Sequence, residues 1–304
     1  MLKFLSQLVS EPMRPGFKDS SAVHELPYDH SILLENLMDP AHIPISRDRT
    51  DLSAKRENAQ PLRCELNERT DRGFAGWWGG GDAETLPNFL RFEAPCVLSN
   101  NREFIDEKGV KQYFSGLFLC RPTGQGKSML IVRFGGTTRP QIANWIPEWF
   151  FHQRECTVFE QDMGFLSSQN EVLMKEKVPT KKLYLNLRSS DTWHAPAGLV
   201  AGASSSFPAK GGTGTTHAPN LANRYFRHVI HCKGCSGALK AFNVWKKALS
   251  AISLALTVFA ILVSGKQGKA ALLVSASLCL AGVYTCSTLI KMSTTNFIRA
   301  HRRF

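Results

Sequence analysis

The sequence predicts an α+β domain followed by two helices that cross a membrane. Residues 61–138 resemble a series of strands, with alternating apolar and polar residues and turn residues between them. Helical patterns occupy residues 141–177, and strands followed by helices are typical of an α+β fold. Two uncharged, mostly apolar runs then occupy residues 248–264 and 270–290. These three observations define the expected fold class.

The elements of the domain follow from local patterns. A short helix is predicted at 31–38, because apolar residues recur at helical spacing and Pro40 ends the pattern. Residues 62–66 alternate as a half-buried strand should. The runs YFSGLFLC and SMLIVRFGG flank the turn RPTGQGK and predict a hairpin. The turn contains TGQGKS, but a phosphate-binding loop requires glycine where Arg121 stands, and it opens a helix, so nucleotide binding is not expected.

Three helical segments are predicted after the strands. Residues 141–153 contain four large aromatic residues and predict a buried helix, and residues 157–177 predict a second helix with acids early and lysines late. Residues 194–220 are rich in Gly, Ala, Ser, Pro and Thr, which is the composition of a linker. A basic amphipathic helix is predicted at 221–247, interrupted by HCKGC.

The two terminal apolar runs predict a transmembrane helical hairpin. Each is close to the about 20 residues that a membrane-spanning helix needs, and neither has a polar face. Lysine and arginine are more frequent on the flanks than in the connecting loop GKQGK, so both flanks and the soluble domain are expected on the positive-inside face. The flanking cations are Lys240, Lys246, Lys247, Lys291, Arg299, Arg302 and Arg303, against Lys266 and Lys269 in the loop.

Composition excludes several classes of protein. The chain has 304 residues, of which 43% are hydrophobic and 20% charged, so it can bury a core and is not disordered as a whole. Its formal charge of +12 is spread along the chain without a stripe of cations and aromatics, so no nucleic-acid partner is expected. Eight cysteines in a chain of this length do not make a disulfide scaffold.

The segment ENLMDPAHIPISRD is the strongest candidate for a metal site. Asn36, Asp39 and His42 follow the spacing N-x-x-D-x-x-H. A non-haem iron oxygenase site needs two imidazoles and one carboxylate, and the usual pattern has a second histidine where this chain has Arg47, which offers no lone pair. Asp162 is the candidate carboxylate. His42 as a loop histidine and Asp162 as an acid at a helix N-terminus are the ordinary alternatives.

The motif HCKGC has three interpretations. Cys232 and Cys235 form a CxxC preceded by His231, and they could be a redox-active dithiol, half of a zinc site or two incidental thiols. A zinc site needs two more ligands, and His217 and His228 are near in sequence but fit no standard spacing. The surrounding cations favour a thiolate and hence the redox interpretation.

Six segments together resemble the pheophorbide a oxygenase family of plant Rieske oxygenases, with its chlorophyllide a oxygenase relatives, and the chain is most like the protochlorophyllide-dependent translocon component of that group. The resemblance covers the chain from about residue 28. The segments are NLMDPAHIPIS, RFEAPCVL, EQDMGFLSSQNEVLMKEK, LYLNLRSSDTW, HAPNLANRYFRHVIHC and the terminal hairpin.

The resemblance implies a helix-grip catalytic domain in which an antiparallel sheet wraps a long helix around mononuclear iron. His42, a second histidine and Asp162 would hold Fe(II), while Asp39 and Asn36 would connect it to a Rieske 2Fe-2S cluster of a neighbouring subunit. Ferredoxin would supply electrons, the substrate would be a chlorophyll-type tetrapyrrole, and Cys232 and Cys235 would be a thioredoxin target. The location would be a chloroplast membrane, with the inner envelope favoured over the thylakoid and the soluble domain on the stromal side.

Three departures from the family pattern lead us to expect impaired chemistry. No CxH…CxxH cluster motif precedes residue 28, so ligands for 2Fe-2S are absent from this chain. Arg47 replaces the second histidine, and the segment between Trp193 and His194 is shortened. Any oxygenase activity would then need full-length Rieske oxygenase subunits as partners. The alternative is a non-catalytic, redox-responsive component of a chloroplast envelope complex.

These expectations divide the chain into six segments. They are a remnant or linker at 1–27, a truncated oxygenase catalytic domain at 28–193, a linker at 194–220, a basic amphipathic helix with the CxxC at 221–247, two transmembrane helices within 248–290, and a basic tail at 291–304.

Overall fold

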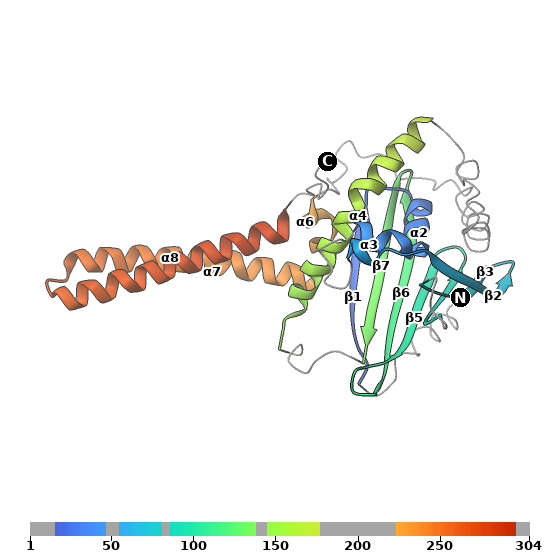
Figure 1. The fold of residues 1–304 in the computed structure, drawn as a ribbon. Coiled ribbons are helices and arrows are strands. Elements are labelled where there is room, and N and C mark those ends of the chain that lie inside the picture. The colour runs from blue at the N-terminus through green and yellow to red at the C-terminus, as the bar shows by residue number, and fades with distance from the viewer. Residues whose placement is uncertain (1–15, 47–54, 81–85, 138–144, 177–222, 296–304) are drawn as a thin grey trace.

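One antiparallel sheet organises the N-terminal part of the chain, and a helical hairpin projects away from it (Figure 1). The computed structural model describes residues 16–46, 55–80, 86–137, 145–176 and 223–295. The sheet has seven strands in the order β1-β7-β6-β5-β4-β3-β2, and helices lie across one of its faces. The predicted α+β class, an antiparallel sheet with helices, is confirmed. The strands are β1 (Lys18–Leu26), β2 (Leu62–Thr70), β3 (Gly73–Gly80), β4 (Asn88–Glu93), β5 (Val97–Ile105), β6 (Lys111–Gly124) and β7 (Lys127–Gly136).

Strand β1 lies in a segment that the sequence analysis left outside the domain. It pairs with β7 from Lys18 opposite Gly136 to Leu26 opposite Ser128, so residues 18–26 belong to the sheet and not to the predicted linker at 1–27. Only the second half of the strand alternates in burial, with Ala22, His24 and Leu26 buried. The polar first half hid the strand from a search for alternating apolar residues.

The predicted helix at 31–38 is present as α2 (His30–Met38). Asp29 caps it, accepting a hydrogen bond from the backbone N–H of Ser31 at 2.9 Å. Pro40 ends the α-helical pattern and opens a short 3-10 turn, η1 (Pro40–His42), which places the His42 side chain just beyond the helix. The short α3 (Ile43–Ser46) and η2 (Arg56–Asn58) follow.

Residues 148–176 form one helix, α4 (Glu148–Glu176), where the sequence analysis expected two helices at 141–153 and 157–177. No helix breaker separates the two patterns, so the helix continues through them. Trp145 is 88% exposed and precedes the helix, so it is not part of a buried segment. The buried face of α4 packs on the sheet through Cys156, Phe159, Met163 and Leu166. The core between sheet and helices also includes Leu26, Leu33, Leu34, Phe92, Leu98, Leu130 and Val132.

The hairpin begins directly at the CxxC motif. Short elements α6 (Arg224–Arg227) and η5 (Val229–His231) precede α7 (Lys233–Leu262), and α8 (Lys266–Thr294) returns alongside it. The helix predicted at 221–247 is interrupted at HCKGC, as expected. The part that starts after Cys232 does not end at residue 247, because nothing there stops it, and it continues unbroken into the apolar run.

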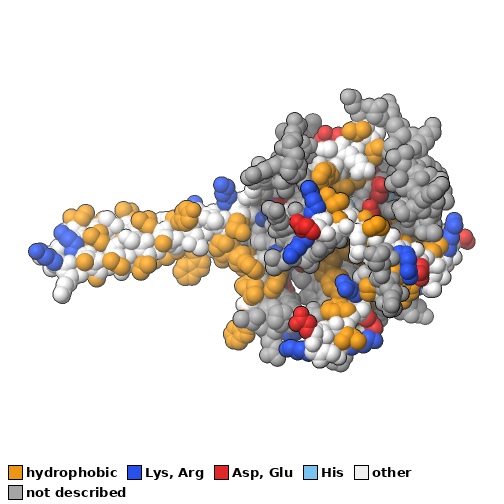
Figure 2. Space-filling view, in the orientation of Figure 1, with side chains coloured by type: hydrophobic (Ala, Val, Ile, Leu, Met, Phe, Trp, Pro, Cys, Tyr) orange, Lys and Arg blue, Asp and Glu red, His pale blue; other side chains and the backbone are white. Residues whose placement is uncertain are grey.

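Helices α7 and α8 are long and apolar enough to cross a membrane, and only 11% and 6% of their most apolar windows are buried within the protein. Figure 2 shows apolar side chains along the length of the hairpin. The two helices meet through small residues: Ser253, Ala260 and Ala276 are buried, and the Ser253 hydroxyl donates a hydrogen bond to the carbonyl of Ala276 at 3.1 Å. Small residues at such a seam let two helix backbones approach closely, as in membrane bundles.

Candidate functional site

A pocket between α2 and α4 brings together the residues that the sequence analysis placed in a metal site. It has a volume of about 320 Å³. Nε2 of His42, at the end of η1, lies 3.8 Å from Oδ2 of Asp162 in the middle of α4. Asp162 is buried, while His42 is 23% exposed. The lining residues are Ile32, Glu35, Asn36, Asp39, His42, Ile45, Ser46, Asp162, Phe165, Leu166 and Gln169.

Hydrogen bonds orient the His42 ring. Its Nδ1 contacts the backbone carbonyl of Asp39. Because a carbonyl only accepts, Nδ1 carries the proton in the neutral ring, and Nε2 presents a lone pair. The amide Nδ2 of Asn36 lies 3.3 Å from Nε2. His42 and Asp162 therefore direct electron-pair donors toward each other, an arrangement that suits a cation.

Carboxylates are concentrated around this pocket. Glu35 and Asp39 line it together with Asp162. Burial, followed by the negative charge of Asp39, raises the pKa of Glu35. The local charge therefore also favours a cation.

The described residues do not complete the donor set of a non-haem iron oxygenase. They supply one imidazole and one carboxylate, and His42 is the only histidine that lines this pocket within the described ranges. A facial iron site needs a second imidazole. Arg47, at the expected position of that ligand, lies outside the described residues, and a guanidinium cannot serve. The fit to iron is therefore incomplete.

A second, aromatic pocket adjoins the first. It has a volume of about 360 Å³ and shares Asn36 and His42 with the carboxylate pocket. Two buried polar atoms in its lining residues, Nε1 of Trp78 and Oδ1 of Asn100, have no hydrogen-bond partner among the described atoms. Such atoms are rare in native proteins. The pocket is suited to a flat apolar ligand with a few polar groups. Its aromatic lining is Trp78, Phe114, Phe118, Phe134 and Phe159.

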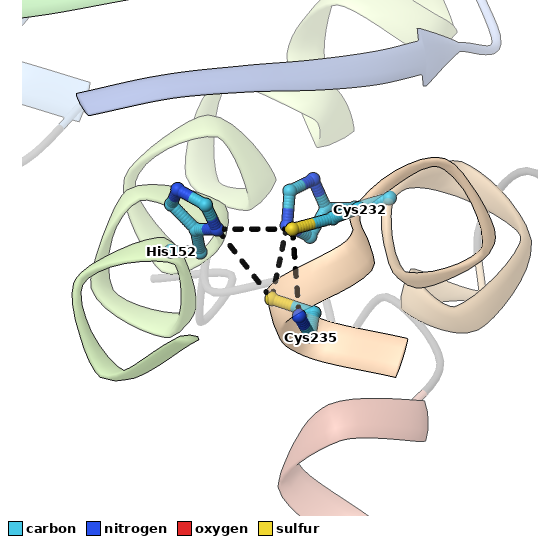
Figure 3. Close-up of side chains that lie close together, drawn as sticks. His152, Cys232 and Cys235 are labelled. Carbon is cyan, nitrogen blue, oxygen red and sulfur yellow. Dashed lines mark hydrogen bonds between the residues drawn. The ribbon is translucent and has the colours of Figure 1, made fainter. Parts of the chain in front are cut away.

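Both cysteines of the CxxC lie against two histidines. Figure 3 shows His152 of α4 beside Cys232 and Cys235: its Nδ1 is 3.3 Å from Sγ of Cys232 and 3.5 Å from Sγ of Cys235. Nε2 of His228 is 3.3 Å from Sγ of Cys235. Both cysteines are free thiols.

A proton is shared within this cluster. The hydrogen bond from Cys235 lowers the pKa of Cys232 well below that of an ordinary thiol, and His152 adds to the effect. Burial opposes protonation of His152, but the hydrogen bond with Cys232 and the charge of Cys232 raise the pKa of the imidazole overall. These shifts favour the thiolate form of Cys232 and the protonated form of His152.

The structure corrects the sequence analysis on which histidines accompany the CxxC. His231, adjacent in sequence, turns away and lies 3.2 Å from the carboxylate of Glu25. His228 lies in the cluster although its spacing fitted no standard pattern, and His217 lies outside the described residues. His152 was missed altogether, since nothing in the sequence relates a residue of α4 to a motif eighty positions later.

Residues 92–179 match the family described as "Pheophorbide a oxygenase", so this part of the chain is similar to that family. This agrees with the family that the sequence segments indicated.

Among curated proteins, "Protein TIC 55, chloroplastic" of Pisum sativum is 66% identical over 95% of this chain and 59% of its own length. The sequence analysis expected the greatest similarity to the protochlorophyllide-dependent translocon component, and this was wrong: "Protochlorophyllide-dependent translocon component 52, chloroplastic" of Arabidopsis thaliana is only 24% identical over 75% of this chain and 49% of its own length. The chain thus spans about three fifths of TIC 55. Among solved structures, dicamba monooxygenase bound to dicamba aligns with a TM-score of 0.42 at 14% identity, over 61% of this chain and 60% of that one.

Proposed function

We propose that this chain is part of a membrane-anchored Rieske-type oxygenase homologue of the chloroplast, that it binds a chlorophyll-type tetrapyrrole, and that its iron affinity is low. The observation that carries the proposal is the convergence of His42 and Asp162 in a pocket that adjoins the aromatic pocket. The related proteins support the substrate class, because their names refer to pheophorbide a and to protochlorophyllide. Ferredoxin and full-length Rieske subunits would supply the electrons.

The proposed location is the inner envelope, with the thylakoid as the alternative, and the domain on the stromal side. The TIC 55 relative carries the word chloroplastic in its name. Lys240, Lys246 and Lys247 lie in the half of α7 nearer the base of the hairpin and Lys291 in the last turn of α8, while Lys266 and Lys269 lie at the tip. More cations at the base than at the tip favour an orientation with the domain on the positive-inside face.

In this proposal each residue of the two pockets has a defined task. Asp162 and His42 would hold Fe(II), and the carbonyl of Asp39 keeps the His42 lone pair directed at it. Asn36 holds the imidazole ring, and Trp78 and Asn100 orient the substrate by its polar groups. Iron, when bound, would supply oxygen activation. The missing imidazole at position 47 weakens its binding.

Restoring the second histidine is expected to restore iron binding. We expect Arg47→His to tighten Fe(II) binding at least tenfold, since even a change in the groups supporting a metal ligand alters affinity by about 10–100-fold. The measurement is anaerobic Fe(II) titration of the purified chain followed by metal analysis. His42→Ala and Asp162→Ala should abolish the gain when combined with Arg47→His. The iron pocket would be refuted if three proteins bound iron equally well: the original chain, Arg47→His, and Arg47→His combined with Asp162→Ala.

Trp78 is expected to contribute to tetrapyrrole affinity through its indole N–H. Trp78→Phe keeps an aromatic ring but removes the donor, so we expect affinity for pheophorbide a to fall about fivefold, the effect of losing a hydrogen bond worth about 1 kcal/mol. The affinity is measured from the absorption shift of pheophorbide a when it is titrated with the chain. Trp77→Phe is the matched control, because Trp77 is 42% exposed and does not line the pocket. Equal losses in both variants would exclude the aromatic pocket as the binding site.

A second candidate function is that of a non-catalytic component that responds to redox state. The free thiols of Cys232 and Cys235, with His152 beside them, favour it. A thiol-trapping gel of the purified chain, with and without reduced thioredoxin after mild oxidation, tests this. If the pair never changes oxidation state, the redox candidate is eliminated.

A further inference from the structure

We propose that His152, His228, Cys232 and Cys235 form a tetrahedral zinc site that joins the sheet domain to the base of the hairpin. The four ligand atoms, one from each residue, all lie within 4.8 Å of one another. Two thiolates and two imidazoles are a standard ligand set for structural Zn²⁺. This site is separate from the His42–Asp162 pocket and does not depend on the function proposed for that pocket.

The distances agree with the edges of a zinc tetrahedron. With Zn–S about 2.3 Å and Zn–N about 2.0–2.1 Å, a sulfur and a nitrogen at two corners lie about 3.6 Å apart. The three sulfur–nitrogen contacts in the cluster measure 3.3, 3.5 and 3.3 Å. Only a small outward movement of the ligands is needed to admit the ion, which would take the place of the proton shared by Cys232 and His152.

Both histidines are held as zinc-ligating histidines usually are. Nδ1 of His228 donates to the backbone carbonyl of Val23 at 2.8 Å, which leaves the lone pair on Nε2 facing Cys235. Nε2 of His152 lies 3.1 Å from the hydroxyl of Ser20, which leaves Nδ1 facing both sulfurs. Metal-ligating histidines typically donate their second ring N–H to such an oxygen, which fixes the tautomer and the ring orientation. Here both supporting oxygens come from β1.

The cysteines are presented by the start of a helix. Cys232 is the N-cap of α7, and its Sγ accepts a hydrogen bond from the backbone N–H of Cys235 at 3.4 Å. Backbone donors and the positive end of a helix dipole stabilise thiolates. Cys235, His152 and His228 are 0%, 3% and 0% exposed, so the ion would be shielded from water except beside Cys232. A structural, fully coordinated site is indicated.

The same geometry argues against an iron–sulfur cluster. Two cysteines and two histidines are also the ligands of a Rieske 2Fe-2S centre, but there the cysteines bind one iron and the histidines the other. Sulfur and nitrogen ligands then lie on opposite sides of the cluster. In this chain the four ligand atoms all lie within 4.8 Å of one another, and sulfur atoms lie at first-neighbour distance from ring nitrogens, which leaves room for one ion only.

The zinc site would hold together three parts of the chain. His152 belongs to α4 and the two cysteines lie at the start of α7 (Figure 3). His228 follows α6. Zinc would add to the contacts of Arg224, which already connects α4 with the end of α8. A metal ion that binds the folded arrangement stabilises it by its binding free energy.

Metal content of the full chain tests this proposal. The chain is purified in detergent from cells grown with zinc, and zinc and iron per chain are measured. We expect about one zinc per chain for the original sequence, His42→Ala and Asp162→Ala, and less than about a tenth of that for His152→Gln, His228→Gln and Cys235→Ser. The matched controls, His231→Gln and Cys96→Ser, should keep their zinc, because His231 and Cys96 do not contribute to the cluster.

A second measurement needs no variant. Apo protein of the original sequence is titrated with Co²⁺, which should give thiolate charge-transfer absorption and the strong visible bands of a tetrahedral S₂N₂ site, displaced by Zn²⁺. Absence of both zinc and the cobalt spectrum in folded protein would overturn the proposal. Two irons per chain with a cluster spectrum would overturn it as well, as would loss of zinc in Cys96→Ser equal to that in Cys235→Ser.

Discussion

Glu160→Ala is expected to lower the free energy of unfolding by about 3–5 kcal/mol, the usual cost of removing one partner of a buried ion pair. Glu160 in α4 accepts hydrogen bonds from two guanidinium groups of α6. It bonds to Arg224 at 2.6 Å through Oε1 and also contacts Arg227. Arg227 is 0% exposed and Arg224 is 7% exposed. The substitution therefore leaves two buried cations without the one carboxylate that pairs with them among the described residues.

The effect should be concentrated where the hairpin joins the domain. Arg224 also donates to the side-chain oxygen of Gln153 at 2.6 Å and to the carbonyl of Met292 at 2.5 Å, so it connects α4 with the end of α8. Hydrogen exchange of α6 and of the last turn of α8 should accelerate most. Urea unfolding of the full chain in detergent gives the free energy.

Two companion variants make this result interpretable. Glu160→Gln keeps an acceptor oxygen and should lose less stability than Glu160→Ala. Glu171→Ala removes an exposed carboxylate from the same helix and should change the free energy of unfolding by less than about 0.5 kcal/mol. If Glu160→Ala were no worse than Glu171→Ala, the buried network would not stabilise the junction.

Local patterns in the sequence predicted most of the strands and identified His42 and Asp162 as candidate site residues. Residues 62–66 and the hairpin around Gly126 follow the alternation that burial on one face requires, and the structure has them as strands. His42 and Asp162 were proposed as partners, and they lie 3.8 Å apart. That pairing came from a family resemblance, because no local rule relates a turn after α2 to the middle of α4.

The parts that the sequence analysis missed depend on contacts between distant segments. β1 is a strand because β7 offers it an edge, although its first half has no alternation of its own. His152 joins the CxxC because the first turns of α4 lie beside the start of α7, and no sequence rule relates two segments eighty positions apart. The sequence patterns known for zinc sites place ligands a few residues apart in short loops. These patterns do not describe a site whose ligands come from α4, α7 and the residue after α6.

Leu280→Asp is expected to weaken membrane insertion of the hairpin by about 3–4 kcal/mol, more than about 100-fold in the insertion equilibrium. Leu280 lies in α8 near the middle of the predicted span 270–290, and its side chain is 57% exposed on the surface of the hairpin. Aspartate at the centre of a span costs about 2.5–3.5 kcal/mol, and the favourable contribution of leucine is lost in addition.

Extraction of membranes at alkaline pH distinguishes an inserted hairpin from one in water. The original chain should stay with the membrane pellet, while Leu280→Asp should move largely to the supernatant. Lys269→Asp adds the same group near the tip, outside the predicted span, and should remain in the pellet. If the hairpin lay in water, Leu280→Asp would change the free energy of unfolding by less than about 0.5 kcal/mol. Leu280→Asp and Lys269→Asp would then fractionate alike. That result would contradict the membrane anchor. The anchor is expected because the hairpin exposes a row of leucine, valine and phenylalanine side chains, and a surface of this kind favours contact with lipid.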